Sequence, residues 1–205
     1  MDYYPPLYSN NCYHIFNRGN NSENLFYKHD NYLYFLQQYD YYLSNYLETY
    51  AYCLLPNHFH LLVRVKDFNK QKIELKKGLK TLTEPNEIVS ELFRRLFTGY
   101  AKAINKQEER TGSLFQKNFK RIVVSNEFYF NQLIYYIHAN PQRHGIVEDF
   151  KKYPYSSYTS ILSEKPTKLL RKETLEWFGS KQSFETFHNR EQSLKDINGW
   201  MIEDD

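Results

Sequence analysis

The 205-residue sequence has few of the residues that cross-link a small fold or anchor a chain in a membrane. Its two cysteines, Cys12 and Cys53, are too few for a disulfide framework or a four-cysteine zinc site, so we expect a reducing, cytoplasmic location. No apolar run approaches the ~20 residues that cross a bilayer. The first residues, Met-Asp-Tyr-Tyr-Pro-Pro, lack a basic segment followed by an apolar one, so we expect neither a membrane span nor a signal peptide.

Tryptophan and methionine are also scarce, with two of each, whereas there are 20 tyrosines and 15 phenylalanines. Tyrosine packs well in a core and also stacks on nucleic-acid bases. The net charge is only +3, but residues 64–121 hold 15 Lys and Arg against 7 Asp and Glu, and residues 185–205 hold 2 against 6. A basic middle segment fits a phosphate-binding face, and it also fits an ordinary solvated surface.

Hydrophobic periodicity and turn residues predict an alternation of strands and helices. A loop with room for a short helix is expected over 66–85, and the proline at 141 is expected to end the last helix near Asn140. The predicted strands are Tyr13–Arg18, Glu48–Leu54, His58–Val65 and Asn118–Val124, and the predicted helices are Asp30–Leu47, Asn86–Gln107 and one that Ser125 or Asn126 caps.

This order predicts an α+β fold of the ferredoxin-like split βαβ type, with a four-stranded antiparallel sheet and helices on one face. We expect one domain over 1–160, with an insertion at about 66–85. Residues 161–205 would form a C-terminal extension with two short amphipathic segments, around Leu169–Phe178 and Phe184–Ile197.

Two local patterns indicate chemistry. His58 and His60 alternate on one strand, so both imidazoles point to one face and could share a metal ion. On the last predicted helix Gln132, Tyr136 and Asn140 form one stripe at i, i+4 and i+8. Taken alone, each pattern also fits a structural role: a surface histidine pair, and a helix packed through its aromatics.

Together these segments resemble the single-tyrosine transposases. Asn57-His58-Phe59-His60 looks like their HUH motif (His, bulky hydrophobe, His), and Tyr136-Ile137-His138-Ala139-Asn140-Pro141 looks like their Tyr-x-x-x-Asn-Pro motif. Three further matches occur in the expected order over residues 10–160, and they favour the REP-associated tyrosine transposases within this group. They are Tyr13-His14-Ile15-Phe16-Asn17-Arg18-Gly19-Asn20, Gly112-Ser113-Leu114-Phe115-Gln116 and Tyr153-Pro154-Tyr155-Ser156-Ser157-Tyr158.

The resemblance implies metal-dependent, sequence-specific cleavage and joining of single-stranded DNA next to a hairpin. Tyr136 would be the nucleophile and would form a 5′-phosphotyrosine. His58, His60 and Asn140 would hold Mg²⁺ or Mn²⁺, with manganese the better match to mixed nitrogen and oxygen ligands. Tyr135 is the rival nucleophile, one residue out of the family's register, and His138 faces elsewhere.

The expected partner is single-stranded DNA with a hairpin made by a palindromic repeat, and the relatives leave open whether the chain is a monomer or a homodimer. The residues expected to contact DNA are Asn17, Arg18, Lys102, Lys106, Arg110, Lys117, Lys120 and Arg121. Three alternatives remain: a non-catalytic single-stranded nucleic-acid-binding module of the same fold, a rolling-circle or relaxase-type nickase, and a structural zinc site at the histidine pair.

Overall fold

The computed structural model describes residues 4–67, 79 and 81–190, and it has a four-stranded antiparallel sheet at its centre. The strands are β1 (Cys12–Arg18), β2 (Leu47–Leu55), β3 (His58–Val65) and β4 (Lys120–Val124). Their order across the sheet is β2-β3-β1-β4, so β1 and β3 are the inner strands. The predicted α+β fold with a four-stranded antiparallel sheet is confirmed.

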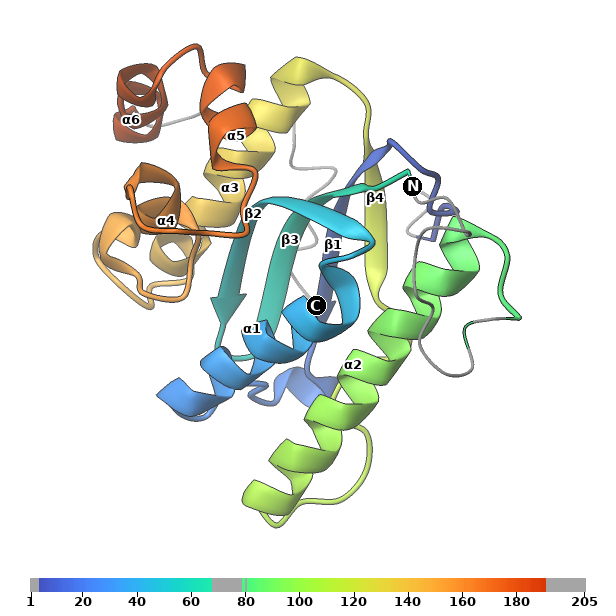
Figure 1. Ribbon diagram of the computed structural model, residues 1–205. Helices are drawn as coiled ribbons and strands as arrows, with labels where there is room; N and C mark the ends of the chain where they lie inside the picture. Colours follow the sequence, from blue (N-terminus) through green and yellow to red (C-terminus); the bar gives the residue numbers. More distant parts are fainter. Residues whose placement is uncertain (1–3, 68–78, 80, 191–205) are drawn as a thin grey trace.

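Helices cover both faces of this sheet, not one as the sequence predicted. The helices α1 (His29–Leu43) and α2 (Pro85–Gln107) pack together across the near face in Figure 1. The helix α3 (Glu127–Arg143) packs on the other face, against β2 and β3. One apolar cluster therefore lies between the sheet and α1 and α2, and a second lies between the sheet and α3.

The remaining chain forms short helical elements after α3. They are η2 (Phe150–Lys152), α4 (Tyr158–Leu162), α5 (Arg171–Trp177) and α6 (Lys181–Asn189), and a further turn, η1 (Asn20–Ser22), follows β1. Figure 1 shows α4, α5 and α6 grouped beside α3. None of the helices in the described part of the chain is long and apolar enough to cross a membrane.

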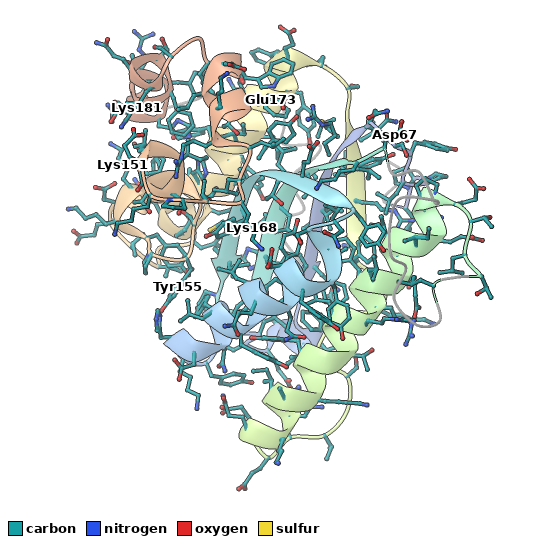
Figure 2. The ribbon with its side chains drawn as sticks, in the orientation of Figure 1. Asp67, Lys151, Tyr155, Lys168, Glu173 and Lys181 are labelled. Atoms are coloured by element: carbon teal, nitrogen blue, oxygen red, sulfur yellow. The ribbon has the colours of Figure 1, made fainter. Side chains whose placement is uncertain are left out.

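The chain that follows α3 also protects the edge strand β2. The backbone of Leu54 bonds to Tyr155 at 2.9 Å and that of Leu170 bonds to Thr49 at 2.9 Å, so two segments run along an edge that would otherwise expose unpaired backbone groups. Glu173 of α5, labelled in Figure 2, accepts two hydrogen bonds from Arg64 of β3, at 2.8 and 3.0 Å. The extension is thus bound to the sheet through backbone and side chains.

Several predicted helix ends differ from the observed ones. The helix α2 begins at Pro85, with Glu84 as its N-cap, because proline is well suited to the first helical turn. The helix α1 begins at His29, one residue before the predicted cap, and stops at Leu43. Most of the predicted 66–85 insertion and the final residues of the extension lie outside the described residues.

The largest difference in helix bounds concerns α3. The sequence predicted an end near Asn140, but the helix runs through Pro141 to Arg143. Proline lacks only its own N–H, and the next turn still closes because His144 N donates to Asn140 O at 3.0 Å. The extra turn brings His144 against His58 of β3.

Candidate active site

The histidine pair lies between β3 and α3. His58 and His60 project from the same face of the strand, with ring centroids 5.1 Å apart and planes at 88°. Both side chains are buried, with exposed fractions of 7% and 4%. Phe59, between them, points into the core under α1 and α2. The strand alternation therefore places two imidazoles together beneath α3.

Each histidine of the pair forms a hydrogen bond through Nδ1. The Nδ1 of His58 lies 2.6 Å from Oδ1 of Asn57, and because an amide oxygen only accepts, His58 carries its proton on Nδ1. The Nδ1 of His60 lies 2.9 Å from Nε2 of His14, on the neighbouring strand β1. These bonds orient both rings. They leave Nε2 of His58 available to a ligand, and Nε2 of His60 as well when His60 is the donor to His14.

Burial keeps these histidines neutral. It is the main cause that lowers the pKa of His14 to about 3 and that of His58 to about 3, and it holds the pKa of His60 well below its usual range. Electrostatic interactions with the neighbouring side chains of His144 and Arg18 lower the pKa of His58 further. A neutral imidazole is the form that binds a metal ion.

The tyrosine and asparagine of the second motif come from α3. Asn126 caps this helix, its Oδ1 accepting a 2.8 Å hydrogen bond from Tyr129 N. Tyr136 is buried, and its ring lies 5.4 Å from that of His60 and 6.1 Å from that of His14. Tyr135 points to the other side, towards Phe150, Phe187 and His188.

Asn140 lies in the sequence between two residues that contact the histidine pair. Four residues before it, Tyr136 touches His60, and four residues after it the ring of His144 lies 5.0 Å from that of His58. Asn140 is completely buried, and neither polar atom of its side chain has a hydrogen-bond partner among the described residues. A buried amide without partners is costly, so this site fits an added ligand.

The turn after Pro141 adds two cationic or titratable side chains that the sequence analysis did not single out. The guanidinium of Arg143 lies 5.4 Å from the centroid of the Tyr136 ring. His144 lies against His58, as described above. Their helical spacing from Tyr136 and Asn140 is a usable signal, but the expected helix end at Asn140 hid it.

A structural zinc site finds no support in the described residues. No three His, Cys, Asp or Glu side chains among them are grouped as metal ligands. Cys53 is paired in register with His60 on the neighbouring strand, but it is buried and burial raises the pKa of its thiol well above the usual range. His58, His60 and Asn140 stay the predicted ligand set.

The residues predicted to contact DNA fall into two groups. Three have side chains that bind to other parts of the fold. Asn17 Nδ2 donates to Gln116 O at 3.3 Å, and Arg121 Nε donates to Pro5 O at 2.7 Å. Arg110 forms a salt bridge with Glu23. Arg18 is paired in register with His58, at the end of β1 nearest the histidine pair. The lysines at 102, 106 and 117 are exposed, and Lys120 is half-buried.

Part of this set lines a groove between α2 and the segment 112–119. Its volume is about 930 Å³, and Asn17, Lys102, Lys117 and Arg121 contribute to its walls together with the rings of Phe97, Phe115 and Phe119. The groove belongs to the α2 side of the sheet, whereas the histidine pair lies under α3.

No protein-family model matches the sequence. Over 113 residues the chain is 30% identical to a Haemophilus influenzae protein named as a REP-associated tyrosine transposase, a match that covers 54% of this chain and 58% of that protein. The resemblance predicted from the motifs is confirmed. The chain spans somewhat more than half the length of this transposase relative.

A solved structure agrees in fold. The structure of a REP-associated tyrosine transposase bound to a REP hairpin matches 81% of this chain, and the match covers 89% of that chain, with a TM-score of 0.58 and 18% sequence identity. At this identity the likeness to the solved transposase establishes the shared fold.

Proposed function

We propose that this chain is a metal-dependent, sequence-specific endonuclease and strand transferase that acts on single-stranded DNA at a hairpin. The observation that carries the proposal is the way α3 lies over the histidine pair. Tyr136 of this helix contacts His60, His144 at its end contacts His58, and Asn140 lies midway between Tyr136 and His144 in the sequence. All of these residues come from one chain. A non-catalytic binding module would need no such convergence.

The donors at this site fit a divalent ion. The Nε2 atoms of His58 and His60 and the Oδ1 atom of Asn140 would hold it, and Mg²⁺ or Mn²⁺ is the proposed metal. When bound, such an ion stabilises negative charge on a phosphate. The fit rests on two neutral imidazoles that are oriented through Nδ1, and on a buried amide with no hydrogen-bond partner in the described residues.

Tyr136 would supply the covalent step. Its phenolic oxygen bonds to phosphorus while the bond from phosphorus to the 3′ oxygen breaks, which gives a 5′-phosphotyrosine and a free 3′-hydroxyl that gains the proton. The phosphodiester bond is exchanged rather than hydrolysed, so a 3′-hydroxyl can reverse the step and join strands. Arg143, over the tyrosine ring, and Arg18, beside His58, would place positive charge around the phosphate.

Tyr136 is 1% exposed, so access to its hydroxyl requires that neighbouring side chains move. The exposed turn that carries Arg143 and His144 is the part of the site nearest the solvent. We therefore expect binding of the DNA flank to displace this turn before the tyrosine can react.

The test is covalent capture of a hairpin oligonucleotide with single-stranded flanks, in Mg²⁺ or Mn²⁺. Tyr136→Phe should lower formation of the protein–DNA adduct by about 10³-fold or more while hairpin affinity stays within about threefold, because only the nucleophilic oxygen is lost. Tyr135→Phe is the matched control and should react as the unmodified chain does. An adduct that survives Tyr136→Phe but not Tyr135→Phe would contradict the assignment, and hairpin binding with no adduct in any variant would favour the binding module.

A further inference from the structure

A chain of buried hydrogen bonds joins the tyrosine helix to the C-terminal extension. The Nδ1 of His138, in α3, lies 3.0 Å from the Nε2 of His188, in α6. The Nε2 of His138 lies 2.8 Å from Ser157 Oγ. The Nδ1 of His188 lies 2.8 Å from the backbone oxygen of Phe184, and Ser157 Oγ accepts from Tyr52 N at 2.9 Å. The three side chains are at most 2% exposed.

The chemistry of its ends fixes every proton in this chain. A carbonyl oxygen only accepts, so His188 donates from Nδ1 to Phe184 and accepts at Nε2. His138 must then donate from Nδ1 and accept at Nε2, which makes Ser157 the donor to His138. Burial lowers the pKa of His188 to about 4, so its ring is neutral as this arrangement requires.

This chain of hydrogen bonds joins α3 to three other parts of the fold. Tyr52 belongs to β2, Ser157 begins the segment that leads into α4, and His188 lies in α6. His138 is placed between Tyr136 and Asn140 in sequence, on the side of α3 that packs against Tyr158 of α4 and Phe184 of α6. The hydrogen bonds of His138 therefore restrain the rotation of α3 over His58 and His60, in addition to the packing of α3 on β2 and β3.

We propose that Ser157, His138 and His188 are positioning residues that hold the tyrosine helix over the histidine pair as cleavage requires, and that α6 of the C-terminal extension takes part in this through His188. The inference rests on the proposed function for the role of Tyr136. Its physical basis is that removal of any one member leaves a buried donor or acceptor of its neighbour unpaired, which favours a shift of α3.

The experiment compares two replacements of His188. His188→Gln keeps an acceptor near the position of Nε2 and so keeps the bond to His138, whereas His188→Phe keeps a planar ring, somewhat larger than imidazole, and removes the bond. The exposed neighbour Thr186→Ala, on the same helix, is the control for any substitution in α6. We measure hydrogen exchange of the amides of residues 134–141, the rate constant of adduct formation at saturating hairpin DNA, and the hairpin affinity.

We expect His188→Phe to raise exchange in α3 and to lower the saturating rate by about tenfold, with hairpin affinity unchanged and exchange in β1 and β3 unchanged. His188→Gln should stay close to the unmodified chain. The opposite order, with Phe tolerated and Gln disruptive, would show that the ring only fills space and would overturn the proposal. Equal, unchanged exchange in both variants would overturn it as well.

Hydrogen exchange separates this proposal from the proposed function, because it needs no cleavage. If no variant forms an adduct, higher exchange in α3 for His188→Phe but not for His188→Gln still supports the positioning role. If His188→Phe does not fold, Ser157→Ala serves instead, since it removes the donor to His138 with little loss of volume. Unchanged exchange in α3 for Ser157→Ala would overturn the proposal.

Discussion

At the scale of single residues, ring nitrogens decide what the histidine pair can bind. For His58 the partner at Nδ1 is an amide oxygen, so the available atom is Nε2. For His60 the partner is another histidine, His14, and either His60 Nδ1 or His14 Nε2 can be the donor of the hydrogen bond between them. Only the arrangement in which His60 donates to His14 leaves Nε2 of His60 free to bind a metal ion.

His14 should therefore contribute to metal affinity without touching the metal. Replacement His14→Phe removes the acceptor for His60 and should weaken Mn²⁺ binding by about tenfold or more, the usual effect of losing a partner that orients a ligand. Mn²⁺ titration followed by electron paramagnetic resonance, without DNA, measures this directly. The exposed His29→Phe is the control and should bind Mn²⁺ as the unmodified chain does; equal affinity for His14→Phe would show that His60 needs no orienting partner.

At the scale of elements, a close backbone approach at the end of β1 supports the histidine pair. Gly19 follows this strand, its N–H donates to Asn57 O at 2.8 Å, and Asn57 in turn orients His58. A Cβ at position 19 would lie 2.0 Å from the backbone oxygen of Glu23. No side chain fits there unless the backbone moves.

Gly19→Ala should accordingly lower stability by about 1–3 kcal/mol, the usual cost of overpacking against a backbone that must shift. The loss should be read from chemical denaturation, together with a weaker Mn²⁺ affinity because Asn57 moves with the turn. Gly99→Ala, in α2, is the matched control, since a Cβ there meets nothing within 4 Å and alanine favours a helix. Unchanged stability of Gly19→Ala would mean that the turn relaxes freely.

The elements also show how far sequence reasoning reaches. Alternation predicts β3 at its observed bounds and puts both histidines on one face, because side-chain direction in a strand follows from local geometry alone. The predicted end of α3 is wrong because the local effect of Pro141 does not include the packing that carries the helix one turn further. His14 and His188 are not identified as partners from the sequence because their contacts join residues 46 and 50 positions apart.

At the scale of the whole molecule, one chain supplies every residue of the candidate site. The helix α3 packs on its own β2 and β3, and the extension holds it there from the outside. A homodimer is thus not needed to assemble the site. The positive charge is arranged differently, since Lys102 and Lys117 line a groove on the α2 side of the sheet.

This separation predicts that hairpin binding and cleavage respond to different residues. The plot of log binding constant against log salt should fall steeply, because basic side chains displace counterions from phosphates. The double variant Lys102→Gln/Lys117→Gln should make the slope shallower by about 2, near 1 for each phosphate that is no longer neutralised. It should leave the rate of adduct formation at saturating DNA unchanged, since neither lysine is near Tyr136.

Fluorescence anisotropy over a salt series measures the slope, with the exposed Lys165→Gln of the extension as control. A slope that does not change would remove this groove from the DNA-binding surface, and would place the phosphate-binding side chains on the α3 side, beside Arg18 and Arg143.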